Sequence, residues 1–134
     1  MNKFAVLAIL VAVFSVSFSA CAQPAQNNNV LAPDAFKEKL AATPNALLID
    51  VRTPEEVAEC QIAGASNINF NAPDFKAQME KLDRTRPLFI YCAAGGRSAK
   101  ACNAVKDMGF PVVYDLKGGF SAWRNTINAM MSCQ

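Results

Sequence analysis

The sequence contains no histidine among its 134 residues. Without an imidazole, the chain cannot form a Ser-His-Asp or Cys-His nucleophile system, a histidine-ligated zinc site or a histidine general base. It also has no Cys-x-x-Cys motif, so a thioredoxin-type dithiol site has no support. Any thiol that the protein activates must therefore depend on backbone N–H groups, a helix dipole, or the cations of arginine and lysine.

The chain also lacks an excess of charge of either sign. Lys3 is the only charged residue among the first 22, so removal of that segment would take the 13 basic residues to 12, against 11 acidic ones. A net charge of +1 gives no basic patch, and we expect no nucleic-acid partner. With 52% apolar residues and no long low-complexity tract, the chain has room for one core and one domain.

An apolar segment follows Lys3 and runs from Phe4 to Ala20, interrupted only by three serines. A positive residue, an apolar stretch and small residues at its end are typical of a secretory signal. The alternative is a membrane-spanning helix, but 17 residues are at the short end of the length that crosses a bilayer. We therefore expect an export signal over residues 1–22 rather than a permanent anchor helix.

The end of this segment carries two overlapping cleavage patterns. Residues 18–21, Phe-Ser-Ala-Cys, resemble a bacterial lipobox with Phe18 in place of the commoner Leu, and they predict cleavage before Cys21 and lipidation of Cys21. Residues 20–22, Ala-Cys-Ala, also match the A-x-A pattern of ordinary signal peptidase, with cleavage after Ala22. We favour the lipoprotein. The expected location is the periplasm or the cell envelope, with a lipid anchor as the only contact with the membrane.

The remainder of the chain divides into a polar linker over residues 23–29 and a folded domain over residues 30–134. Within the domain, short apolar runs alternate with segments of helical periodicity. The predicted strands are 29–31 at an edge, 46–51, 66–70, 87–92 and 111–116, and the predicted helices are 32–42, 53–60, 72–82, 98–109 and 119–131. This alternation predicts an α/β fold with a central, mostly parallel sheet of about five strands and helices on both faces.

Cys92 ends one of the two strongest predicted strands, at the edge of a parallel sheet where ligands bind. The loop after it is Ala-Ala-Gly-Gly, which has no bulky side chain, so its backbone N–H groups can turn inward around the sulfur. A helix that begins near Arg97 or Ser98 adds its positive end. Both effects favour the thiolate, so we predict that Cys92 is a nucleophile in an anion-binding loop.

Cys92 has two alternative interpretations. A buried structural cysteine would suit Cys102, inside the following helix, better than Cys92, and it would leave the small-residue loop unexplained. A phosphate-binding loop would need the G-x-x-x-x-G-K-[ST] spacing, which residues 93–100 do not have. The nucleophile is the interpretation that accounts for both the thiol and the loop.

Five segments together resemble the single-domain rhodanese family of sulfurtransferases. They are Leu-Leu-Ile-Asp-Val-Arg-Thr-Pro-Glu-Glu-Val, Ile-Ala-Gly-Ala-Ser-Asn-Ile-Asn, Phe-Ile-Tyr-Cys-Ala-Ala-Gly-Gly-Arg-Ser-Ala-Lys-Ala, the run from Gly109 to Phe120, and Ser-Ala-Trp. The resemblance spans about residues 30–124 and implies a rhodanese-like fold. It makes Cys92 the cysteine that forms a persulfide, and it makes Asp50 and Arg52 largely structural. The substrate-binding loop that it implies consists of Ala93, Ala94, Gly95, Gly96 and Arg97.

The chain departs from the family at Cys60 and Gln61, where Gly-His is common. Cys60, Cys102 and Cys133 allow three disulfide pairings in an exported protein, and their spacing does not choose among them. Loop length is a further guide, because Cys92 and Arg97 enclose four residues, whereas the related phosphatases have a C-x5-R loop that is one residue longer. The shorter loop suits a sulfane sulfur on the cysteine.

We therefore expect a thiosulfate sulfurtransferase that works by double displacement through a Cys92 persulfide, with no cofactor and no metal. Its expected partners are a small-molecule sulfur donor, a small-molecule acceptor and a thiol protein. Arg97 has two roles open to it: it could guide the donor's sulfonate, or it could serve only in helix-start packing or a surface ion pair. Phe120 and Trp123 are expected in the core. The alternative function is a rhodanese-fold binding or redox module of the cell envelope that does not turn over.

Overall fold

The computed structural model describes residues 28–126 and 129–134. The predicted signal segment and the lipidation of Cys21 lie outside the described residues, as does most of the predicted linker. The first strand begins at Asn28, two residues inside that predicted linker. In the part of the chain that the structure describes, no helix has the length and apolar content needed to cross a membrane.

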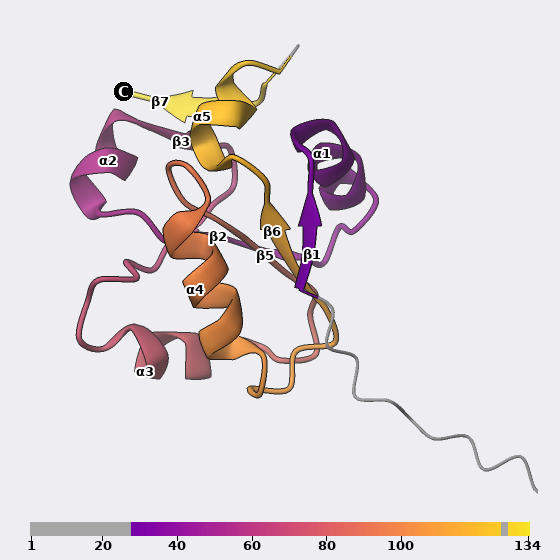
Figure 1. The fold of residues 1–134 in the computed structure, drawn as a ribbon, viewed down its shortest axis with the longest axis vertical. Helices are drawn as coiled ribbons and strands as arrows, with labels where there is room; N and C mark the ends of the chain where they lie inside the picture. Colours follow the sequence, from indigo (N-terminus) through magenta and orange to yellow (C-terminus); the bar gives the residue numbers. More distant parts are fainter. Residues whose placement is uncertain (1–27, 127–128) are drawn as a thin grey trace, which may run out of the picture.

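A five-stranded parallel sheet forms the centre of the molecule (Figure 1). Its order is β1-β6-β5-β2-β4, with β1 at one edge as the sequence predicted. The strands are β1 (Asn28–Leu31), β2 (Leu47–Asp50), β4 (Ser66–Asn67), β5 (Leu88–Tyr91) and β6 (Val113–Leu116). The central position of β5 explains why all four of its residues are buried, and it places Cys92 at the middle of the sheet's carboxyl edge.

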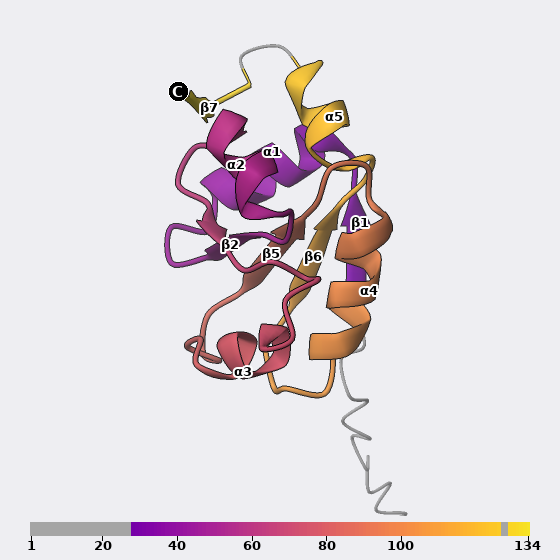
Figure 2. The same ribbon diagram turned by 90° about the vertical axis from the view of Figure 1, so that its left-hand side faces the viewer.

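Helices cover both faces of the sheet, which confirms the predicted fold class (Figure 2). The helices are α1 (Pro33–Ala41), α2 (Pro54–Glu59), α3 (Phe75–Glu80), α4 (Gly96–Val105) and α5 (Gly119–Arg124). On one face, Met79 of α3 and Val105 of α4 pack in a cluster with Ile90. On the other, Phe36 of α1 and Trp123 of α5 pack in a second cluster, so the prediction of a core role for Trp123 is confirmed.

The start of α2 forms as its sequence predicts. Thr53 precedes Pro54 at the first helical position, and the Thr53 hydroxyl accepts a hydrogen bond from the Glu56 backbone N–H. The Glu56 carboxylate accepts one from the Thr53 backbone N–H at 3.0 Å, which completes a capping box. This box fixes the position of Glu56 at the carboxyl edge of the sheet.

Asp50 and Arg52 form a buried ion pair behind α2. The carboxylate of Asp50 accepts from the backbone N–H of Arg52 at 3.0 Å and from its guanidinium at 2.7 Å. The guanidinium also donates to the Cys60 carbonyl and lies 4.3 Å from the centre of the Phe120 ring. Each charge is therefore paired and hydrogen-bonded inside the protein, as the largely structural role expected for these residues requires.

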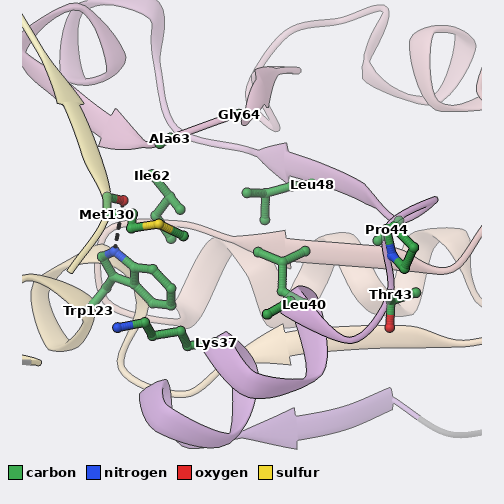
Figure 3. Close-up of a pocket in the computed structure, with 12 residues that line it drawn as sticks. Lys37, Leu40, Thr43, Pro44, Leu48, Ile62, Ala63, Gly64, Trp123 and Met130 are labelled. Atoms are coloured by element: carbon green, nitrogen blue, oxygen red, sulfur yellow. Dashed lines mark hydrogen bonds between the residues drawn. The ribbon is translucent and has the colours of Figure 1, made fainter. Parts of the chain in front are cut away.

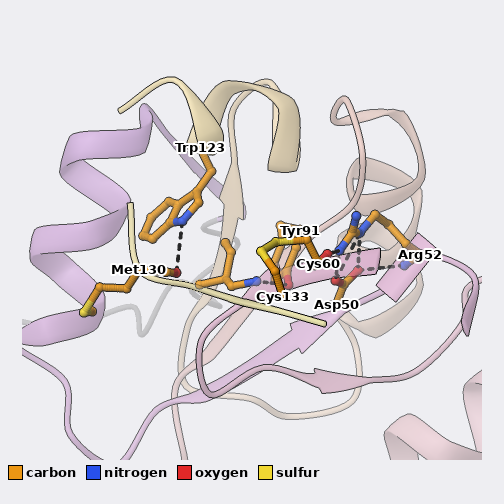
Figure 4. The surroundings of a disulfide bond; sticks show 8 residues. Asp50, Arg52, Cys60, Tyr91, Trp123, Met130 and Cys133 are labelled. Carbon is orange, nitrogen blue, oxygen red and sulfur yellow. Dashed lines mark hydrogen bonds and ion pairs between the residues drawn. A yellow bond between two sulfur atoms is a disulfide. The ribbon is translucent and has the colours of Figure 1, made fainter. Parts of the chain in front are cut away.

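The chain after Arg124 differs from the sequence prediction. A helix was expected over residues 119–131, but α5 ends at Arg124 and residues 131–133 form the strand β7 (Met131–Cys133). This strand pairs antiparallel with β3 (Cys60–Ile62) in a separate two-stranded sheet. A disulfide joins Cys60 to Cys133 across the pair, and Figure 4 shows it beside Arg52 and Tyr91. Of the three pairings that spacing allowed, the structure contains this one.

Candidate active site

Cys92 lies directly after β5, where the chain leaves the sheet and turns toward α4. The residue is 1% exposed, and its thiol is free. The prediction placed Cys92 between a buried strand and a helix at the carboxyl edge of a parallel sheet, and the structure shows that position. At this edge the carboxyl ends of β2, β5 and β6 lie side by side, with β5 in the middle.

The loop after Cys92 curls around the sulfur atom. The backbone N–H of Gly95 donates to Cys92 Sγ at 3.1 Å, and Gly95 has a φ of 108°, a conformation that glycine adopts easily. Burial of the thiol opposes its ionisation. The Ser98 hydroxyl and the backbone N–H groups of Ser98, Gly95 and Ala94 outweigh burial and hold the pKa of Cys92 below its ordinary value. The loop therefore stabilises negative charge on the sulfur without a histidine.

The start of α5 holds the other side of this loop. The backbone N–H of Phe120 donates to the Cys92 carbonyl at 2.7 Å, and that of Ser121 donates to the Ala93 carbonyl at 3.0 Å. A Cβ atom on Gly119 would lie 2.5 Å from the Cys92 carbonyl oxygen, so only glycine permits this approach. The sequence signal for this role of Gly119 is the Gly118-Gly119 pair at the start of α5, to which no function was predicted.

Arg97 makes an ion pair with Glu56 of α2. Its two terminal nitrogens each donate to one carboxylate oxygen at 2.7 Å. This bidentate bond to Arg97 lowers the pKa of Glu56 to about 2. Of the two roles left open for Arg97, the structure shows the ion pair, which ties α2 to the first turn of α4. Glu56 was not predictable as the partner of Arg97, because 41 positions separate the two residues in the sequence.

A pocket of about 190 Å³ lies beside the loop and has charged walls. Its lining includes Ala93, Ser121, Glu59 and the exposed residue Arg124. A second pocket, of about 290 Å³, lies by α1 and is lined largely by apolar side chains such as Leu40, Leu48 and Trp123 (Figure 3). The smaller pocket contains a residue of the Cys92 loop and the larger one does not, so the smaller pocket is the candidate binding site for a reactant of Cys92.

The second free thiol, Cys102, is not a candidate nucleophile. It is 1% exposed, inside α4, and burial raises its pKa above the ordinary value. Among the described residues, no group of three or more Cys, Asp or Glu side chains is arranged to hold a metal ion. Of the two free thiols described, Cys92 is the one whose pKa is lowered, and it is the candidate nucleophile.

Known proteins resemble this chain over most of its length. The family model described as Rhodanese-like domain matches residues 32–126. A sulfurtransferase of Allochromatium vinosum is 33% identical over 95 residues, which cover 71% of this chain and 87% of that protein. The thiosulfate sulfurtransferase GlpE of Stutzerimonas stutzeri is 37% identical over 82 residues, covering 60% of this chain and 72% of that one.

Solved structures show the same fold. The crystal structure of a rhodanese-related protein from Thermoplasma volcanium superimposes with a TM-score of 0.68 at 24% identity, covering 78% of this chain and 98% of that chain.

Proposed function

The chain belongs to the rhodanese-like domain family, and from this premise we propose that it transfers a sulfane sulfur from thiosulfate, or a donor of the same kind, to a thiophilic acceptor through a persulfide on Cys92. The observation that carries the proposal is the arrangement at Cys92. The Cys92 thiol is buried, has a lowered pKa and accepts hydrogen bonds from backbone N–H groups of the loop. This loop is one residue shorter than that of the related phosphatases.

In the first step, the Cys92 thiolate attacks the outer sulfur of thiosulfate. A bond forms between Cys92 Sγ and that sulfur, the sulfur–sulfur bond of thiosulfate breaks, and sulfite leaves with the electron pair. The outer sulfur then carries negative charge inside the loop. The backbone N–H groups that face Cys92 Sγ and the N-terminal end of α4 would stabilise this charge, as they stabilise the thiolate.

In the second step, cyanide or a thiolate attacks the outer sulfur of the persulfide. The acceptor gains the sulfur atom, the sulfur–sulfur bond breaks, and Cys92 returns to the thiolate. No net change in oxidation state of the enzyme occurs over the cycle, so no redox cofactor is required. A protein thiol could approach as acceptor in the same way as a small thiol, because both present one sulfur atom to the loop.

Loop length supports sulfur transfer over phosphate chemistry. Four residues separate Cys92 from Arg97, and the N–H of Gly95 already lies 3.1 Å from the cysteine sulfur. A tetrahedral phosphate would need a wider ring of donors than this loop offers. The small ring suits a single additional sulfur atom.

The donor's anionic group requires a cation that is not already paired. Arg97 is engaged with Glu56 through both terminal nitrogens, which argues against its predicted role as the donor's guide. Arg124 projects from the last turn of α5, is exposed, and lines the pocket that also contains Ala93. We assign the guidance of a sulfonate to Arg124 rather than to Arg97.

Export to the cell envelope belongs to the same proposal. The apolar segment after Lys3 supports it, as does the Cys60–Cys133 disulfide, since disulfides persist in oxidising compartments. With Cys21 lipidated, the domain would reach its sulfur donor and acceptor from a lipid anchor. Radiolabelled palmitate incorporation in wild type and in Cys21→Ser tests this point, and label in the variant equal to that in wild type would refute lipidation of Cys21.

The test of the function is a thiosulfate:cyanide assay on Cys92→Ser, with Cys102→Ala as the matched free-thiol control. Serine fits the loop but cannot carry a sulfane sulfur, so thiocyanate production should fall to background in Cys92→Ser alone. Circular dichroism establishes that each variant is folded. Substantial transfer by folded Cys92→Ser would move the nucleophile to another cysteine, and no transfer by wild type with any sulfane donor would favour the binding or redox module.

A further inference from the structure

The candidate binding pocket has two charges of opposite sign that are not neutralised by the residues around them. Four charged residues line this pocket: Arg52, Glu56, Glu59 and Arg124. Arg52 and Glu56 are engaged in the two ion pairs described above. Among the residues that the structure describes, no ion pair engages Glu59 or Arg124. Both residues are exposed, so both charges are accessible to a bound molecule.

Both charged residues belong to segments that are anchored at the pocket. Glu59 is the last residue of α2, and the next residue, Cys60, is held by the disulfide and by its carbonyl, which accepts from Arg52 at 2.7 Å. Arg124 is the last residue of α5. Its guanidinium carbon lies 6.0 Å from the centre of the Phe120 ring, which also lines the pocket. The two charges are therefore presented by different elements of the fold on one pocket.

The pocket adjoins the loop that holds the nucleophile. Ala93, Phe120 and Ser121 line it. The backbone N–H groups of Phe120 and Ser121 donate to the carbonyls of Cys92 and Ala93, at 2.7 and 3.0 Å. A molecule bound in the pocket therefore lies beside the first residues of this loop.

Neither helix stability nor an anionic donor accounts for Glu59. The carboxyl end of a helix carries partial negative charge, so an acidic residue in the last turn of α2, where there is no basic residue, is electrostatically unfavourable. Thiosulfate and cyanide are both anions, and the Glu59 carboxylate would repel each of them. Glu59 instead suits a reactant that carries a positive charge.

A carboxylate and a guanidinium on one small pocket match a zwitterion. We propose that the acceptor of the persulfide sulfur is a small aminothiol of the cysteine kind, with its ammonium group at Glu59 and its carboxylate at Arg124. The pocket volume of about 190 Å³ is below the range of sites for drug-sized ligands, which favours a free aminothiol over a longer peptide. The inference rests on the proposed function, and it makes Glu59 a specificity-determining residue.

The double displacement allows donor and acceptor to use Arg124 in turn, because sulfite leaves before the acceptor binds. The aminothiol reacts as its thiolate, after its proton has passed to the solvent. A bond forms between the thiolate sulfur and the outer sulfur of the Cys92 persulfide, and the sulfur–sulfur bond of the persulfide breaks. Its electron pair returns to Cys92 Sγ, and the aminothiol leaves as a persulfide.

The test measures how fast single thiols discharge a preformed Cys92 persulfide. Purified protein with its disulfide intact is loaded with thiosulfate, separated from the donor and mixed with a thiol below saturation. Intact-mass spectrometry then follows the loss of one sulfur atom. Three thiols are compared: cysteine carries both charges, cysteamine carries only the ammonium, and N-acetylcysteine carries only the carboxylate. The ratio of wild-type to variant rate with the same thiol cancels the reactivity of that thiol.

Glu59→Gln should slow discharge by cysteine and by cysteamine about fivefold, the effect of one exposed charge contact, and should not slow discharge by N-acetylcysteine. Arg124→Ala should slow cysteine and N-acetylcysteine by a similar factor and should not slow cysteamine. The matched control is Glu55→Gln, because Glu55 is also exposed on α2 but does not line the pocket. This control makes the same change in net charge as Glu59→Gln, and it should slow none of the three thiols.

Circular dichroism establishes that each variant is folded. No slowing of cysteine by Glu59→Gln, or equal slowing of cysteine and N-acetylcysteine, would overturn the inference. Equal effects of Glu59→Gln and Glu55→Gln would also overturn it, because they would show that only net charge matters.

Failure of this inference and failure of the proposed function can be told apart. Loading of Cys92 by thiosulfate reports on the function before any thiol is added. A wild type that takes up sulfur but whose discharge does not depend on Glu59 would contradict the aminothiol acceptor and leave sulfur transfer intact. If thiosulfate loads no sulfur, inorganic polysulfide is the second donor for the discharge experiment. A protein that forms no persulfide with either donor would overturn both.

Discussion

At the scale of single residues, the Cys92 thiol is activated by one hydroxyl and a few backbone N–H groups, without a histidine. The loop N–H groups and Ser98 lower the pKa of Cys92, whereas burial raises the pKa of Cys102 only ten positions later. The two thiols have nearly equal burial, each 1% exposed, so hydrogen-bond donors rather than exposure separate their reactivity. Local environment thus selects one nucleophile.

Replacing Arg124 with alanine tests the guidance of the donor at this scale. One exposed charge contact contributes about 1 kcal/mol, so KM for thiosulfate should rise about fivefold while kcat changes little. The assay is thiosulfate:cyanide transfer at low ionic strength, where charge effects are largest. Arg84→Ala is the matched control, because Arg84 is exposed, does not line the candidate binding pocket and bonds only the Glu80 carbonyl among the hydrogen bonds described. Equal effects of the two changes would remove Arg124 from donor binding.

At the scale of elements, the strands and helices that build the site could be predicted from sequence. The start of α2 could be predicted because its signals are local: a capping box between Thr53 and Glu56, and Pro54 at the first helical position. The strand β7 was not, because all three of its residues are exposed and because both its pairing with β3 and its disulfide to Cys60 are non-local. The ion pair between Arg97 and Glu56 was also not predictable from the sequence. The sequence predicts a helix at each residue, but it does not show that the two side chains face one another.

The Arg97–Glu56 pair predicts a specific dependence of stability on pH. The pKa of Glu56 is about 2 in the folded protein and ordinarily 4.5, so the stabilisation is complete above about 4.5 and is lost as pH falls toward 2. Glu56→Gln keeps a capping acceptor but loses the charge. Because both side chains are partly exposed, we expect a loss of only about 1 kcal/mol in the free energy of unfolding at pH 7.

Urea denaturation of wild type and Glu56→Gln across this pH range would measure the difference. The two curves should converge as pH approaches 2. A difference that stays constant with pH would mean that the substitution acts through packing and not through the ion pair.

Loop length gives a further prediction at this scale. Insertion of one glycine after Gly96 should reduce thiosulfate:cyanide transfer at least tenfold, because the backbone N–H groups would no longer converge on the outer sulfur. The matched control is a glycine inserted after Gly109, in the turn between α4 and β6. Activity of the first variant equal to that of the control would show that the size of the loop does not matter for sulfur transfer.

At the scale of the whole molecule, the Cys60–Cys133 disulfide fastens the end of the chain to the carboxyl edge of the sheet. Its two cysteines are 73 positions apart, so the bond restricts a large part of the unfolded chain. Cys60 lines the small pocket and packs against the core cluster that contains Phe36 and Trp123. Cys92 belongs to the core cluster on the opposite face of the sheet. Sequence offered three pairings and could not choose, because the choice depends on β3 and β7 lying side by side.

Loss of this disulfide should lower stability without abolishing the fold. Cys133→Ser should reduce the free energy of unfolding by about 2–4 kcal/mol, and reductant should destabilise wild type by a similar amount. Denaturation with and without reductant provides the measurement, and reductant should have no effect on Cys133→Ser. Equal stability of wild type and variant under oxidising conditions would show that the bond contributes nothing.

The central claim is that Cys92 carries the transferred sulfur, and intact-mass spectrometry of thiosulfate-treated protein tests it most directly. Wild type should gain the mass of one sulfur atom, lose it on addition of cyanide or dithiothreitol, and yield the modified peptide containing Cys92. Cys92→Ser should gain nothing, while Cys102→Ala should behave as wild type. A wild-type protein that gains no sulfur, or a Cys92→Ser variant that gains it, would contradict the account.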